Sequence, residues 1–156
     1  MVIPEWISGP ILLGAVGWLI SKWWERRTDK DKARRTELRQ KIDETCTVVG
    51  TIERNAHNYF VLPVNDLSVA ALARSILRDL TLLANKCHDI DCAMNGAYAS
   101  GRCKAFKQAV TLNDFQSVRR QPVLPNDLLL DAITQKARSL EANLERAFRT
   151  EFNDNI

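Results

Sequence analysis

The residues best suited to chemistry in this chain are cysteines and a histidine that lie close together in the sequence. Thiolate and imidazole are the ligands that zinc prefers, and the candidates are Cys87, His88, Cys92 and Cys103. Their spacing argues against a zinc site, because Cys-x4-Cys is wider than a common zinc knuckle and residues five positions apart on a helix point about 140° apart. Cys87 also fits a core position. We therefore predict no metal site and interpret all four cysteines, including Cys46, as reduced and mostly buried thiols.

A cysteine nucleophile would need a base within hydrogen-bond reach of its thiol. The two histidines, His57 and His88, have no recognisable motif around them. The carboxylates of Asp89 and Asp91 are two positions apart, so they diverge on a helix and make a poor acid–base pair. The scattered glycines form no phosphate-binding loop. We predict no catalytic residue, no cofactor and no small-molecule substrate, and hence no enzymatic activity.

Residues 102–120 form a basic block that could contact nucleic acid, with five Lys or Arg residues against one acid. The candidates are Arg102, Lys104, Phe106, Lys107, Arg119 and Arg120. A solvated helix face explains the charge equally well, and Phe106 fits a core position. Because most of the remaining chain is net acidic, we expect no nucleic-acid partner.

The opening stretch "WISGPILLGAVGWLISKWWERR", residues 6–27, decides where any such chemistry would take place. Sixteen uncharged residues separate Glu5 from Lys22, and a helix from Trp6 to Trp24 would measure about 28 Å against a hydrocarbon core of about 30 Å. Its apolar residues surround the helix, which argues against a helix lying in the membrane plane. A cleaved signal would begin with basic residues. We predict a transmembrane helix, with a buried helix of a soluble protein as the alternative.

Charge and aromatic residues at the end of this stretch predict its orientation. The expected membrane-interface residues are Trp6, Trp18, Lys22, Trp23, Trp24, Arg26 and Arg27. No Lys or Arg precedes the apolar run, whereas several follow it, so the N-terminus should lie outside and the C-terminal domain in the cytoplasm. A stripe of small residues could let a second span approach closely. That stripe consists of Gly14, Gly17 and Ser21.

Three later segments repeat apolar positions at alternating spacings of three and four, which is typical of one helical face. The three apolar rows are Leu38, Ile42, Thr45, Val49, Ile52, Ala56 and Tyr59; Val69, Ala73, Ile76, Leu80, Leu83, Cys87, Ile90 and Met94; and Leu130, Ile133, Ala137, Leu140, Leu144 and Ala147. We predict an all-α chain: one N-terminal transmembrane helix, then an antiparallel helical bundle of three long helices plus one or two short ones. The expected parts are an anchor (1–24), a basic helical stalk (25–37), a cytoplasmic bundle (38–152) and a tail (153–156).

The expected helices end where helix-breaking residues occur. These breaks are Pro63, the pair Asn95 and Gly96, and the pair Pro122 and Pro125. Asp66 and Asn126 are the expected N-caps. The second helix carries further apolar residues beside its main row, which would make it the central helix of the bundle. These residues are Leu67, Ala70, Ala71, Leu77 and Ala84.

Together these features favour a non-catalytic interaction or scaffold protein that presents its bundle at the cytoplasmic face of a membrane. Its expected partners are the lipid bilayer and either a protein or a second copy of the chain. One alternative is a lysis-type or envelope-spanning protein of a phage or bacterium, with the bundle outside the cytoplasm. Another is a membrane-tethered metal-binding or cysteine-dependent enzyme that would use the Cys/His cluster.

Overall fold

The computed structural model describes residues 5–96, 98–112, 115–117 and 119–153, and within the first helix the side chains of residue 18, residues 21–24 and residues from 27 onward. Four helices follow one another: α1 (Glu5–Val61), α2 (Val69–Ala93), α3 (Ser100–Thr111) and α4 (Leu128–Asn153). No strand occurs in these described ranges, so the predicted all-α class is confirmed. The chain divides into two compact units, Met1–Glu37 and Leu38–Ile156.

The first unit contains the N-terminal part of α1. Every described side chain from Trp18 to Glu37 is exposed. In the part of the chain that the structure describes, no helix has a stretch both long enough and apolar enough to cross a membrane. The structure therefore does not support the predicted transmembrane helix over residues 1–24, of which residues 1–4 lie outside the described ranges.

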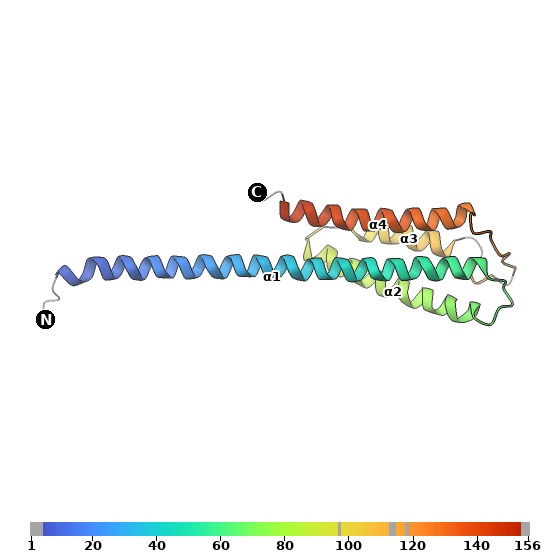
Figure 1. The fold of residues 1–156 in the computed structure, drawn as a ribbon, viewed down its shortest axis with the longest axis horizontal. Coiled ribbons are helices and arrows are strands. Elements are labelled where there is room, and N and C mark those ends of the chain that lie inside the picture. The colour runs from blue at the N-terminus through green and yellow to red at the C-terminus, as the bar shows by residue number, and fades with distance from the viewer. Residues whose placement is uncertain (1–4, 97, 113–114, 118, 154–156) are drawn as a thin grey trace. The chain divides into compact units, whose positions relative to one another are not determined.

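The second unit is a helical bundle formed by α1 from residue 38 onward together with α2, α3 and α4. Successive helices run in opposite directions (Figure 1). The Nη1 atom of Arg39, near the start of this unit, lies 2.6 Å from Oε2 of Glu145. His57, close to the end of α1, contacts Thr134 near the beginning of α4. This reversed order along the two helices is the expected consequence of antiparallel packing.

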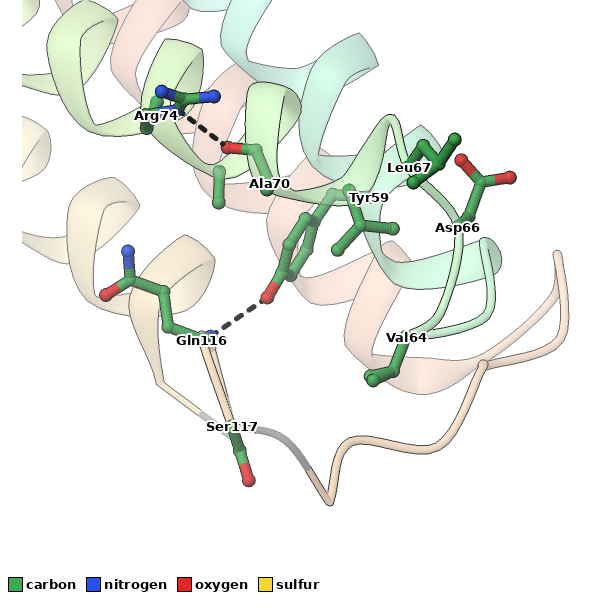
Figure 2. Close-up of a pocket in the computed structure, with 10 residues that line it drawn as sticks. Tyr59, Val64, Asp66, Leu67, Ala70, Arg74, Gln116 and Ser117 are labelled. Carbon is green, nitrogen blue, oxygen red and sulfur yellow. Dashed lines mark hydrogen bonds between the residues drawn. The ribbon is translucent and has the colours of Figure 1, made fainter.

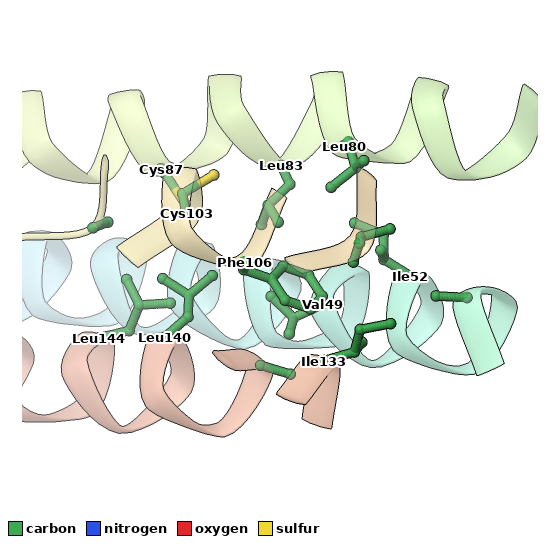
Figure 3. Packing of buried hydrophobic residues seen from close by; sticks show 14 of the residues in the cluster. Val49, Ile52, Leu80, Leu83, Cys87, Cys103, Phe106, Ile133, Leu140 and Leu144 are labelled. Atoms are coloured by element: carbon green, nitrogen blue, oxygen red, sulfur yellow. The ribbon is translucent and has the colours of Figure 1, made fainter. Parts of the chain in front are cut away.

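The core of the bundle is built from the three predicted apolar rows, and every residue in those rows is buried. Phe106 of α3 joins them with no exposed surface. Figure 3 shows Val49, Leu83, Phe106 and Leu140 meeting from the four helices. Full burial of an aliphatic side chain of this size contributes about 1.5–3 kcal/mol. Helical periodicity therefore selected the correct face of α1, α2 and α4.

The additional apolar residues predicted for the second helix do not lie in this core, and Leu67 among them precedes α2. Leu67, Ala70, Ala71, Leu77 and Ala84 are all exposed. The prediction that a broad apolar stripe of this helix is buried is therefore wrong: besides the main row, the buried residues of α2 are Asp79 and Asp91. The outward side of α2 carries the small and apolar residues together with Arg74, Arg78 and His88.

The predicted helix breaks after α1 and α2 are confirmed, whereas the predicted N-caps need correction. Asn95 adopts a left-handed conformation with φ of 51°, and the Gly96 amide donates to the Asp91 carbonyl oxygen at 3.1 Å, which together end α2 as expected. Asp66 accepts from the Ser68 amide at 2.8 Å, but Ser68 occupies the N-cap position of α2.

The start of α4 is capped one residue later than predicted. Oδ1 of Asp127 accepts a hydrogen bond from the Leu129 amide at 2.8 Å, so Asp127 rather than Asn126 caps the helix. Either residue type can make this bond, and the position of the turn decides between neighbours. Between α3 and α4, the described residues 115–117 and 119–127 are not helical, so only one short helix forms in the described part of this segment.

Candidate functional site

The four candidate zinc ligands form two separate pairs. Cys87 of α2 and Cys103 of α3 face each other in the core (Figure 3). His88 and Cys92 lie on the exposed side of α2, with Nε2 and Sγ 3.6 Å apart. No group of three or more His, Cys, Asp or Glu side chains within the described ranges could hold a metal ion. A single site made of all four residues is therefore not formed.

The thiols of Cys87 and Cys103 are buried and form a hydrogen bond with each other. A hydrogen bond with Cys103 and burial raise the pKa of the Cys87 thiol. The same hydrogen bond lowers the pKa of Cys103. Burial raises the pKa of the half-buried Cys46 to about 11. The prediction of mostly buried thiols holds for these three cysteines, while Cys92 is exposed.

His57 belongs to a polar link between α1 and α4. The Thr134 hydroxyl donates to Oε1 of Glu53 at 2.7 Å, and Nε2 of His57 lies 3.2 Å from the same Thr134 oxygen. The single hydroxyl hydrogen is used toward Glu53, so His57 acts as the donor to Thr134. A general base would accept a proton from the hydroxyl group, whereas His57 donates to Thr134. The three side chains link α1 to α4.

The basic block of residues 102–120 is divided between the surface and the interior. Arg102, Lys104, Lys107 and Arg119 are exposed. Arg120 is only 5% exposed. It is therefore not part of a solvated helix face, and it cannot contact a nucleic acid without leaving the bundle.

Arg120 closes the C-terminal end of α1. Its Nη1 donates to the Phe60 carbonyl oxygen at 3.0 Å and its Nη2 to that of Leu62 at 2.9 Å. The guanidinium carbon lies 4.4 Å from the centre of the Tyr59 ring. The last carbonyl groups of a helix lack partners within the helix, and a cation there also interacts favourably with the helix dipole. Sequence reasoning missed this role because Arg120 is 58 or more residues away from the groups it binds.

A buried carboxylate performs the corresponding task at the start of α3. The two carboxylate oxygens of Asp91 accept from the amides of Ala99, at 2.7 Å, and Ser100, at 3.0 Å. The Ser100 hydroxyl also donates to Asp91. A negative charge at a helix N-terminus is stabilising because of the free amides and the dipole. Asp91 is therefore a structural cap and not half of an acid–base pair.

Exposed tryptophans and basic residues mark the N-terminal unit. Trp18, Trp23 and Trp24 are 62%, 57% and 67% exposed, and the guanidinium of Arg27 lies 5.5 Å from the Trp23 ring centre. Lys22 and Ser21 are also exposed. The side chains of the other predicted interface and helix-pairing residues lie outside the description. These are Trp6, Gly14, Gly17 and Arg26.

Two grooves lie at the end of the bundle where α1 ends and α2 begins. The larger, of about 530 Å³, has apolar walls that include Tyr59, Val69 and Ala73, with Arg74 among the lining residues (Figure 2). The smaller, of about 430 Å³, is lined by His57, Leu72, Pro125 and Leu130, among others. Such volumes, and mostly apolar walls with a few polar groups, are typical of ligand-binding pockets. The polar lining residues include Asp66, Gln116 and Ser117 in the larger groove and His57, Asn58 and Ser68 in the smaller.

Several large apolar side chains are exposed near these grooves. Leu67, which lines the larger groove, is 97% exposed, and Leu124 and Leu128 flank Pro125 of the smaller groove in sequence and are 76% and 83% exposed. Exposed apolar surface of this kind is typical of interaction sites when it is contiguous. Comparisons with protein-family models, curated proteins and solved structures find no match to this chain.

Proposed function

We propose that the chain is a non-catalytic, single-pass membrane-anchored interaction protein. In this proposal residues 1–24 cross the bilayer with the N-terminus outside, residues 25–37 form a basic stalk, and the bundle lies at the cytoplasmic face. The bundle binds a protein partner or a second copy of the chain. The observation that carries the proposal is the cluster of exposed tryptophans followed by exposed basic residues.

The angular positions of the tryptophans favour a crossing helix over one lying in the membrane plane. Relative to Trp18, an ideal helix places Trp23 and Trp24 about 140° and about 240° around the axis. Three rings so distributed surround the helix within a segment of about 9 Å along its axis. A helix that lies in the plane needs its apolar residues on one side, whereas a crossing helix meets the headgroup region on all sides. Tryptophan is enriched at that level.

The exposed cations beyond the tryptophans support the proposed orientation. Lys30, Lys32, Arg34 and Arg35 follow within twelve residues of Trp23 and are exposed, and no Lys or Arg precedes the apolar run. Cytoplasmic flanks of spans carry such an excess, which is attracted to anionic lipid. Free thiols in place of disulfide bonds are also typical of reducing compartments, and the four cysteines are free thiols.

The interaction role rests on the loop end of the bundle. Two mostly apolar grooves lie there; exposed Leu67 lines the larger and exposed Val61 lines the smaller. The polar side chains deeper in the bundle connect its helices to one another. A partner that offers apolar side chains would cover this surface. The proposed surface consists of Val61, Leu67, Leu124, Leu128 and the grooves beside them.

Membrane insertion can be tested by fractionation of the full chain with a matched pair of arginine substitutions. We expect the unaltered chain to stay with membranes after an alkaline wash. Val16→Arg places a charge at the centre of the proposed span, which costs about 2.5–3.5 kcal/mol, or about a hundredfold in the insertion equilibrium. Thr28→Arg adds the same side chain at an exposed position beyond the tryptophans and should have no such effect.

Two outcomes would contradict the proposal. Recovery of the unaltered chain as a compact, monodisperse particle in a detergent-free supernatant would remove the anchor. A C-terminal reporter that is active only outside the cytoplasm would replace the proposed topology with the envelope-spanning alternative. For the interaction role, Leu67→Ser combined with Leu128→Ser should reduce partner or self-crosslinking in membranes, whereas Ala71→Ser, on the exposed side of α2, should not.

A further inference from the structure

The imidazole of His88 and the thiol of Cys92 lie one helical turn apart on the exposed side of α2. The Nε2 and Sγ atoms are 3.6 Å apart, and both residues are exposed. Neither belongs to the core thiol pair or to the polar link between α1 and α4. Both therefore offer a donor atom to solvent from a helix whose backbone is fixed by the core.

The separation of the two atoms is the one that a shared tetrahedral zinc ion requires. Zinc–sulfur and zinc–nitrogen bonds measure about 2.3 Å and about 2.05 Å, and with a tetrahedral angle of about 109° these lengths place sulfur and nitrogen about 3.6 Å apart. The spacing of four residues on α2 supplies this separation between sulfur and nitrogen. In the absence of metal, the thiol hydrogen can occupy the space between the two atoms.

Two protein ligands leave two positions of a tetrahedral ion open. No third His, Cys, Asp or Glu joins the pair among the residues that the structure describes. Structural zinc sites are usually closed by four protein ligands, and Cys2His2 is one of the common sets. A second copy related by a two-fold axis through the ion would supply the missing histidine and cysteine, because the two sides of such an interface are identical.

The same side of α2 offers a surface on which a second α2 can pack. Ala70, Leu77 and Ala84 follow one another at intervals of seven residues, and on an ideal helix they lie within about 40° of His88. All three are exposed, and they alternate on this face with the polar residues Arg74, Thr81 and His88. In a coiled coil, small and apolar side chains at heptad spacing fill one of the two core positions, and in this row polar side chains take the other.

We propose that His88 and Cys92 form one half of a Cys2His2 zinc site that two copies of the chain complete. On binding, the Cys92 thiol releases its proton to water and its sulfur binds the ion, while the unprotonated Nε2 of His88 donates its lone pair; no electron is transferred. The same reaction at the second copy closes the site. This inference goes beyond the proposed function, which requires no metal.

Cobalt(II) is the probe for the test, since it takes the place of zinc and absorbs light when it is bound by thiolate in a tetrahedral site. The reduced, metal-free full chain in detergent micelles is titrated with cobalt and then with zinc. We expect thiolate-to-cobalt and tetrahedral absorption bands that saturate at one ion per two chains and disappear when zinc is added. Light scattering should show the protein mass in the micelle doubling with metal.

Matched variants assign the bands to these residues. His88→Ala and Cys92→Ser should each abolish the absorption and the metal-dependent doubling. The double variant Asn85→His with His88→Ala keeps the number of exposed histidines but places the imidazole about 10 Å from Cys92 along the helix axis. It should also lose the absorption and the metal-dependent doubling. Cys46→Ser should bind cobalt as the unaltered chain does. Circular dichroism checks that each variant keeps its helices.

Three results would overturn the inference: no thiolate–cobalt absorption, absorption that persists in Cys92→Ser, or saturation at one ion per chain. None of them bears on membrane anchoring, because fractionation of the metal-free chain tests the proposed function independently.

Discussion

Replacement of Arg120 by alanine tests whether a buried guanidinium, and not helix propensity alone, fixes the end of α1. The substitution removes hydrogen bonds of 3.0 Å to Phe60 and 2.9 Å to Leu62, and the contact over the Tyr59 ring at 4.4 Å. The Phe60 carbonyl oxygen keeps a partner, since the Val123 amide donates to it at 3.0 Å. Only the Leu62 carbonyl group loses its protein partner in the described structure.

The magnitude follows from these contacts. A hydrogen bond from a charged group contributes about 1.5–3 kcal/mol, and a desolvated cation–π contact contributes about 2 kcal/mol. Burial of the guanidinium offsets part of this sum, because Nε of Arg120 is buried without a hydrogen-bond partner and an unpaired buried donor costs about 1–3 kcal/mol. We expect Arg120→Ala to lower the free energy of unfolding by about 3 kcal/mol, or more than a hundredfold in the equilibrium constant.

Urea unfolding of the full chain in micelles, followed by far-ultraviolet circular dichroism, measures this change. Tryptophan fluorescence is unsuitable, because all four tryptophans lie in residues 6–24. Arg119→Ala is the matched control: the same residue type one position away is exposed, and its loss should change the free energy of unfolding by less than about 0.5 kcal/mol. Equal effects of the two substitutions, or a change below about 0.5 kcal/mol for Arg120→Ala, would refute the reasoning.

Three further predictions follow from the described contacts. Asp91→Ala should lower the free energy of unfolding by about 2 kcal/mol, because α3 loses its cap. Asp89→Ala, at an exposed position nearby, should not lower it, and equal urea midpoints for the two variants would contradict this. A maleimide should label Cys92 first, and Cys46 should stay unlabelled until the pH approaches its raised pKa of about 11, as peptide mass mapping would show. Burial raises the pKa of the Glu141 carboxyl group, so the folded state binds the carboxyl proton more tightly than the unfolded state does. The stabilisation by this bound proton is present below the ordinary pKa of 4.5 and is lost as the pH rises through the raised pKa. Glu141→Gln should therefore stabilise the chain at neutral pH and have little effect below pH 4.5. Urea midpoints measured at neutral pH and below pH 4.5 check this, and a larger effect of the substitution in acid would contradict it.

The sequence by itself determined which residues form the core. Apolar side chains at spacings of three and four share one helical face wherever the helix packs, so the rows beginning at Leu38, Val69 and Leu130 could be assigned from periodicity alone. The break at Pro63 was equally readable because proline lacks an amide hydrogen and clashes with the preceding turn. These are local properties of the backbone, and no distant residue alters them.

Only the tertiary structure decided the roles of Arg120, Asp91 and the cysteines. Each polar role depends on a partner far away in the sequence: Arg120 on the end of α1, and Cys87 on Cys103 of another helix. The outward position of Leu77 is likewise a tertiary result, because periodicity gives the direction of a side chain but not which directions the neighbouring helices cover. Burial and pairing are properties of what lies opposite a residue, and spacing along one chain does not contain that information.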